Sequence, residues 1–100
     1  MRIGLQLPQW GQAAGRSALL AIARAAEEAG FDSVWASDHV IYPLDGPVDY
    51  PYGPGGPPFA PEDGYLEVVT TLSVVAGATE RIGLGTSVLV LPMRETLLAA

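Results

Sequence analysis

The chain has no cysteine among its 100 residues. This absence excludes disulfide scaffolds, thiolate metal sites and cysteine nucleophiles within the chain. No apolar stretch approaches the roughly 20 residues that span a bilayer, and the opening residues, Met1 to Pro8, are too short and too polar for the apolar core of a signal peptide. We therefore expect a cytoplasmic protein that does not contact a membrane.

Positive charge is also scarce. Five basic residues, all of them arginine, stand against eleven acidic ones, which gives a formal net charge of −6. An acidic surface repels phosphate backbones and anionic lipids, so we expect no nucleic-acid partner and no attachment to a membrane surface. The single histidine and the scattered carboxylates form no recognisable metal-binding cluster, so we also expect no metal.

The abundant residues are apolar: 49% are hydrophobic, which is typical of a chain that folds around a core. Short apolar runs predict strands over residues 3–7, 33–36 and 81–90, and longer amphipathic patterns predict helices over 17–29, 65–79 and from 94 onward. Strands and helices alternate, and crossovers of this length join parallel strands with a right-handed turn. The expected fold class is therefore α/β.

The helical patterns also predict which side chains are buried. Helix 17–29 carries one apolar stripe, formed by Leu19, Ile22, Ala23 and Ala26. We expect Ser17 to cap the start of this helix and Gly30, in the left-handed conformation, to end it. The buried side of helix 65–79 is expected to be formed by Leu66, Val69, Leu72 and Ala76.

A sheet of three parallel strands leaves open edges and an uncovered layer. We therefore expect residues 1–100 to be the N-terminal fragment of a single parallel (β/α) barrel domain. The alternative is a partner chain that supplies the remaining strands. By itself the fragment is expected to be inactive and not to fold cooperatively.

Residues 41–64 differ in composition from the rest of the chain. They contain seven of the nine prolines and five of the twelve glycines, with several aromatic residues. A loop of this length inside a domain is usually functional or disordered. Because it follows the C-terminal end of the second strand, where parallel barrels build their active sites, we predict a mobile lid that contributes to substrate selection.

Short polar or irregular segments lie at the C-terminal ends of the three predicted strands, at Pro8-Gln9-Trp10, Ser37-Asp38-His39 and Thr86-Ser87-Val88. In a parallel sheet these ends meet at one rim. A carboxylate next to an imidazole can fix the tautomer of the ring or raise its pKa, which suits a general acid or base. The alternative is that Asp38 caps local amides and His39 is a surface residue.

Two longer motifs carry a family resemblance. The sequences GFDSVWASDHV (Gly30 to Val40) and TERIGLGTSVLVLPMR (Thr79 to Arg94), with the opening RIGLQLPQWG, resemble the bacterial-luciferase-like family of flavin- and deazaflavin-dependent enzymes. Within that family, the motifs are most similar to the coenzyme F420-dependent oxidoreductases. The resemblance covers nearly the whole chain outside residues 41–64.

The resemblance implies an eight-stranded (β/α)8 TIM-type barrel that holds the cofactor ring at the C-terminal rim. It implies that Asp38, Ser87 and Val88 bind the cofactor, that the Ser87-Val88 peptide bond is cis, and that His39 is the catalytic proton donor. Sugar-phosphate dehydrogenases of this branch carry a tryptophan shortly after the histidine. Here the corresponding residues are Val40-Ile41-Tyr42-Pro43, which argues against a sugar phosphate substrate.

The function that follows is an F420-dependent oxidoreductase, which transfers a hydride between a small organic substrate and the deazaflavin. An FMN-dependent luciferase-like monooxygenase is the alternative within the same class. A non-catalytic flavin-binding relative, or a truncated interaction module, is the alternative outside it. We expect a small-molecule substrate and a homodimer of the full-length protein.

Overall fold

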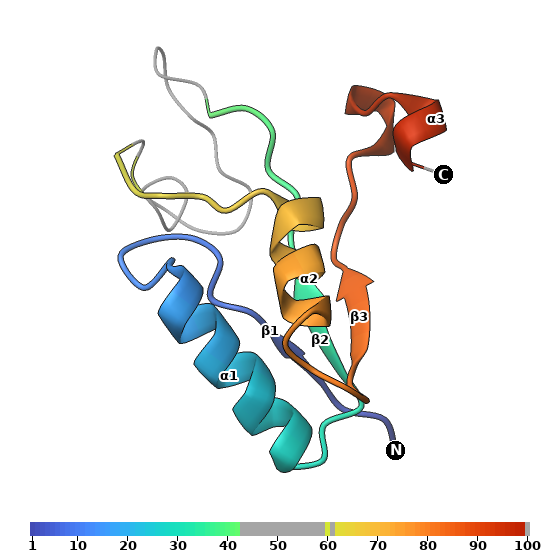
Figure 1. Ribbon diagram of the computed structural model, residues 1–100. Coiled ribbons are helices and arrows are strands. Elements are labelled where there is room, and N and C mark those ends of the chain that lie inside the picture. Colours follow the sequence, from blue (N-terminus) through green and yellow to red (C-terminus); the bar gives the residue numbers. More distant parts are fainter. Residues whose placement is uncertain (43–59, 61, 100) are drawn as a thin grey trace.

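A computed structural model describes residues 1–42, 60 and 62–99. The elements, in chain order, are β1 (Gly4–Gln6), α1 (Arg16–Glu28), β2 (Ser33–Ala36), α2 (Val68–Ala76), β3 (Gly83–Thr86), the 3-10 turn η1 (Leu91–Met93) and α3 (Thr96–Ala99). The three strands form one parallel sheet in the order β1-β2-β3. The predicted α/β class and parallel sheet are thus confirmed, as an open three-stranded sheet in the described residues (Figure 1).

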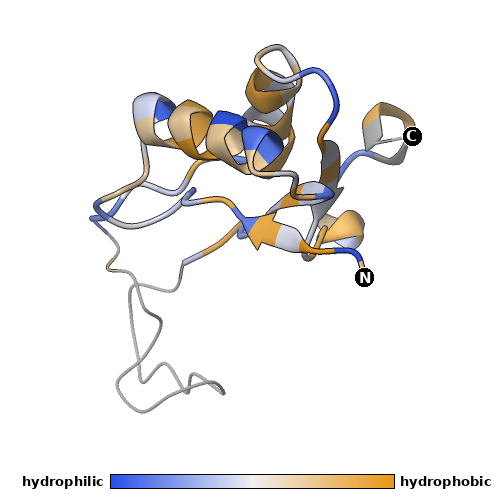
Figure 2. Ribbon diagram, turned by 90° about the horizontal axis from the view of Figure 1, so that it is seen from below, coloured by the Kyte–Doolittle hydropathy of each residue, from blue (hydrophilic) through white to orange (hydrophobic). Residues whose placement is uncertain are grey.

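Both long helices lie on the same side of the sheet (Figure 2). Because side chains alternate along a strand, Val34 and Ala36 of β2 face these helices and are fully buried, while Trp35 faces the opposite side and is 38% exposed. The core between sheet and helices consists of Leu7, Leu19, Ala23, Ala26, Val34, Val75 and Ile82. Among the described residues, no helix covers the face that carries Trp35.

The indole of Trp35 lies across its own strand and both neighbours. A Cβ atom added to Gly85 would come within 2.6 Å of the indole ring, and one added to Gly4 would overlap its Nε1 edge. The indole N–H donates to the hydroxyl of Ser33 at 2.8 Å. Glycine on both neighbouring strands therefore leaves the room in which the ring lies flat against the sheet.

Helix α1 has the predicted stripe, with Leu19, Ala23 and Ala26 buried. The prediction that Ser17 caps the helix is wrong, because Gly15 is the N-cap and its carbonyl accepts the first helical bond, from Leu19 N–H at 3.0 Å. The prediction for Gly30 is confirmed: its φ is 81°. The N–H groups of residues 30 and 31 donate back to the last turn, which is the Schellman arrangement.

Helix α2 begins three residues later than predicted, at Val68 instead of Tyr65. Tyr65 instead forms an antiparallel bridge with Trp10, and the N–H of Leu66 donates to the carbonyl of Gln9 at 2.8 Å. The buried residues of the helix are Val68, Thr71 and Val75. The predicted buried side was therefore wrong by about one position, although Leu66 and Leu72 pack partly against the core.

Strand β3 is shorter than the predicted range of 81–90, although its backbone stays bonded to the β2 segment beyond Thr86. Ser87 N–H donates to Ala36 O at 2.9 Å, and Asp38 N–H donates to Val88 O at 3.1 Å. The Ser87-Val88 peptide bond is cis, as the resemblance implied. The helix expected from residue 94 instead begins at residue 96, since Arg94 has an extended backbone.

Most of the predicted lid, residues 43–59 and 61, lies outside the described residues. Within the part of the chain that the structure describes, no helix combines the length and apolar character needed to cross a membrane.

Candidate functional site at the C-terminal ends of the strands

Three polar side chains connect the C-terminal ends of the three strands. Gln6 ends β1, and its amide N–H donates to the Ser37 hydroxyl at 3.2 Å. Its amide oxygen accepts from the Ser87 hydroxyl at 3.0 Å. The parallel register brings the strand ends level with one another, so these side chains meet on the sheet face opposite the helices. We call Gln6, Ser37 and Ser87 the polar rim.

The amide of Gln9 fixes the backbone just before the Asp38-His39 pair. Its side chain is fully buried, and its amide oxygen accepts from the backbone N–H of Ser37. Its amide nitrogen donates to the carbonyls of Ser37 at 2.7 Å and Leu66 at 3.0 Å. Because a buried amide without partners is costly, this arrangement strongly favours one position of the chain after β2.

Asp38 is a buried anchor between β2 and the segment after β3. Only 3% of its side chain is exposed. One carboxylate oxygen accepts from Arg94 Nη2 at 2.8 Å, and the other accepts from Arg94 Nε at 3.0 Å and from the Val90 N–H at 2.9 Å. This is the two-pronged geometry that guanidinium groups make with carboxylates.

The electrostatics follow from these contacts. The hydrogen bonds from Arg94 lower the pKa of Asp38, with a further contribution from the Val90 N–H, and they outweigh the effect of burial. The carboxylate of Asp38 is thus engaged with Arg94 and a backbone amide. The amide that it binds is not local in sequence, because Val90 lies 52 residues after Asp38.

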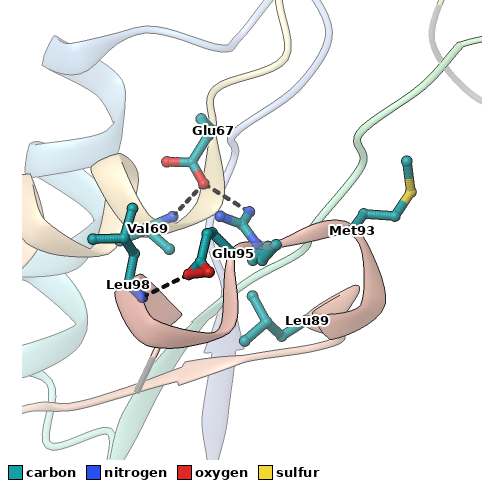
Figure 3. A pocket seen from close by; sticks show the side chains of 7 residues that line it. Glu67, Val69, Leu89, Met93, Glu95 and Leu98 are labelled. Atoms are coloured by element: carbon teal, nitrogen blue, oxygen red, sulfur yellow. Dashed lines mark hydrogen bonds and ion pairs between the residues drawn. The ribbon is translucent and has the colours of Figure 1, made fainter.

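Arg94 also contacts Glu67, which caps helix α2. Both residues line a pocket between α2 and α3, and Figure 3 shows the Glu67 carboxylate above the side chains of Val69, Leu89 and Leu98 in this pocket. Glu67 accepts from Arg94 at 2.7 Å and from the first-turn amides of Val69 at 3.0 Å and Thr70 at 2.6 Å. Burial alone would raise its pKa, but the two amides and the guanidinium together lower the pKa of Glu67 to about 2. The guanidinium thereby joins the end of β2, the start of α2 and the segment that leads to α3.

His39 follows this anchor and lies beside two tyrosines. Its ring centroid is 5.3 Å from that of Tyr65, at an interplanar angle of 41°, and 6.4 Å from that of Tyr42. An open cavity of about 270 Å³ is lined by His39, Val40, Ile41, Tyr42, Ala60, Asp63 and Tyr65. The imidazole is exposed, so it can reach a molecule in this cavity. We call this space the histidine cavity.

The predicted site residues therefore fall into two groups. Asp38, Ser87 and Val88 are joined by backbone and side-chain bonds at the rim, whereas His39 lines the cavity with the tyrosines. The sequence did not single out the residues around them: Gln6 bonds to Ser87 and Arg94 bonds to Asp38. Glu67 bonds to Arg94, and Tyr65 lies beside His39. Arg94 ends one of the two family motifs, and that position was the one signal that could have indicated it.

Parallel strands joined by helices define an α/β protein, and in this class the C-terminal ends of the strands are the candidate place for a ligand. The comparison with protein families makes this specific: the model of the luciferase-like monooxygenases matches residues 3–100. The chain belongs to that family.

Uncharacterised proteins of Mycobacterium tuberculosis and Mycobacterium bovis are similar to the chain. Each is 32% identical to it over 80 residues, which cover 79% of the chain and 28% of the relative. The chain thus corresponds to little more than a quarter of the length of these relatives. No solved structure matches the chain significantly.

Proposed function

We propose that the full-length protein is an F420-dependent oxidoreductase. It transfers a hydride between a small organic substrate and the deazaflavin ring of coenzyme F420, and His39 transfers the accompanying proton. The observation that carries this proposal is the placement of His39, whose exposed imidazole lines a cavity at the C-terminal end of β2. An imidazole has one ring nitrogen that can accept a proton and one that can donate a proton, which suits proton transfer.

The polar rim fits a flat cofactor ring with a polar edge. Val88 exposes 65% of its surface next to the rim and offers an apolar contact for a ring face. Gln6 and Ser87 offer an amide and a hydroxyl that can bond to a ring edge. Ser87 and Val88 would hold the ring, and F420 would supply the two-electron chemistry.

Gln9 and Asp38 hold His39 and the polar rim in position. Gln9 fixes the backbone before Asp38, and Asp38 fixes the backbone after β3 through Val90 and Arg94. We therefore propose that Asp38 is a positioning residue for the cofactor. It acts by holding the end of β2 against the segment after β3. Nucleophiles and bases need this kind of support, because small displacements of a reacting group reduce rates strongly.

An FMN-dependent monooxygenase is the second candidate, because the family includes flavin enzymes and the same rim can support a flavin. Its FMN would occupy the place that we propose for F420. Support for F420 comes from the two motifs that end at Val40 and Arg94, which are most similar to the F420 branch.

The test uses the full-length gene product, freed of cofactor and titrated separately with F420 and FMN. Quenching of tryptophan fluorescence reports binding. We expect F420 to bind and to be reduced or oxidised in the presence of a substrate. Binding of FMN with none of F420 would favour the monooxygenase, and binding of either without turnover would favour a non-catalytic relative.

A further inference from the structure

The histidine cavity has walls suited to a ring. Three aromatic side chains, those of His39, Tyr42 and Tyr65, contribute to it. Two aliphatic side chains add exposed apolar surface, since Val40 is 47% exposed and Ile41 is 64% exposed. Aromatic and aliphatic side chains favour a ring as the ligand, and the polar groups that share the wall can bond to substituents on that ring. At about 270 Å³, the cavity is smaller than the roughly 300–1,000 Å³ of drug-sized sites, which suits a single ring with short substituents.

The charge around the cavity is negative. Asp63 is part of its wall, where one carboxylate oxygen accepts from the Ala60 N–H at 2.9 Å. The preceding residue, Glu62, is exposed and also acidic. A carboxylate a few ångströms from a bound anion repels that anion, and the repulsion is stronger where the local dielectric is lower.

The arginines of this chain do not offset that charge. The chain has five basic residues, and the segment 43–61 contains none of them. Arg94 is engaged by Asp38 and Glu67, and Arg24 donates to the carbonyl of Ala78. Arg2 and Arg81 line a different cavity with Asp32, Gly4 and Gly83, at the N-terminal ends of the strands. The fifth, Arg16, is an exposed residue at the start of α1 and lines another pocket with Thr70 and Val74.

We propose that the histidine cavity binds a compact, ring-bearing substrate that carries no phosphate or carboxylate. The proposal rests on the proposed function, because it names the class of substrate whose proton His39 would transfer. A ring between Tyr42 and Tyr65 would lie against His39, and a hydroxyl, carbonyl or amine on that ring would be accepted. An acidic group would face Asp63 without a cation from this chain to balance it.

The test compares three probes that share one ring and differ in charge: benzyl alcohol, benzylamine and benzoate. Their dissociation constants for the full-length gene product are measured by ligand-observed NMR up to millimolar concentrations, with and without F420. We expect benzyl alcohol and benzylamine to bind about tenfold or more tightly than benzoate, which corresponds to about 1.4 kcal/mol. Asp63→Asn should reduce this difference, and Tyr65→Leu should weaken all three probes.

Glu62→Gln is the matched control, because it removes a neighbouring charge that is not part of the cavity wall. We expect it to change the selectivity less than Asp63→Asn. Equal or tighter binding of benzoate, or selectivity that Asp63→Asn leaves intact, would overturn the proposal, as would failure of all three probes to bind. Charge-selective binding of the probes by a protein that does not bind F420 would instead refute the proposed function and leave the ring site standing.

Discussion

Carboxylates bind backbone amides at both ends of the sheet, but their other partners differ between the two ends. At the N-terminal ends of the strands, one oxygen of Glu27 accepts from three successive amides, of residues 80, 81 and 82, at 2.9, 2.5 and 2.9 Å. Asp32 accepts from the Ile3 N–H at 2.7 Å. At the C-terminal ends, Asp38 and Glu67 also accept backbone amides, but both share the guanidinium of Arg94.

This difference in partners supports our proposal that the C-terminal ends of the strands carry the chemistry. Carboxylates at the N-terminal end bond to backbone and connect one loop to the next, and the amides of Arg81 and Ile82 lower the pKa of Glu27. At the C-terminal end, the ion pairs of Arg94 fix Asp38, directly before His39, and Glu67 at the start of α2, while His39 stays exposed. We infer that substitutions at the first end change stability alone, whereas those at the second end change stability and function.

The largest effect is expected from removing the proton carrier. His39→Ala in the full-length protein should lower turnover by about 10²–10⁴-fold, the range typical of a lost general acid or base. Cofactor affinity and thermal midpoint should change little, because His39 is exposed and the hydrogen bonds of the polar rim join Gln6, Ser37 and Ser87. Steady-state kinetics with a parallel F420 titration measure both, and unchanged turnover would remove His39 from the mechanism.

The same substitution on either side of β2 compares the two ends directly. Asp38→Asn places an amide N–H₂ against the donors of Arg94 in a nearly closed site, so we expect a loss of about 3 kcal/mol of unfolding free energy and weaker cofactor binding. Asp32→Asn removes charge from an exposed residue with one amide partner, and should cost about 1 kcal/mol or less with normal turnover. Urea unfolding and kinetics of both variants provide the comparison, and equal losses at the two positions would contradict it.

Acid sensitivity offers a further test of the Arg94 cluster. The pKa of Glu67 is lowered from 4.5 to about 2, and that of Asp38 is lowered as well. As the pH falls from about 4.5 toward 2, the unfolded chain binds protons that the folded chain does not, so the cluster's contribution to stability is lost. Glu67→Gln should therefore make stability depend less steeply on pH in this window. Urea midpoints between pH 5.5 and 2.5 measure the slope, and a slope equal to that of the wild type would argue against the contribution of Glu67.

The sequence predicted the elements better than their contacts. The strand at 33–36 and the stripe of α1 follow from local periodicity, and both are confirmed. Helix α2 was placed too early because Tyr65 and Leu66 are used in contacts with Trp10 and Gln9, which periodicity does not reveal. The site shows the same division: local order placed Asp38 at the rim, but its partner Arg94 lies 56 residues away.

Effects smaller than that of Asp38→Asn are expected at two glycines that end helices near the N-terminal ends of the strands. Gly30 has a φ of 81°, and a Cβ there would meet no atom within 4 Å, so Gly30→Ala carries only the backbone penalty, about 1–2 kcal/mol. Gly77 has a φ of −73°, and its added Cβ would lie 3.7 Å from two helix carbonyls, an ordinary contact. Gly77→Ala should therefore leave stability unchanged or raise it by up to about 1 kcal/mol.

Urea unfolding measures the stability of both glycine variants, and the benzyl alcohol titration is the functional control. Together they test whether changes at the N-terminal ends of the strands affect the histidine cavity. Both variants lie far from His39 in the fold, so we expect wild-type affinity for the probe in each. Equal stability of the two variants would show that the left-handed glycine is not what holds the turn between α1 and β2. Weakened probe binding in Gly30→Ala would show that the N-terminal end of the sheet is coupled to the histidine cavity, against the division of roles that the carboxylate contacts indicate.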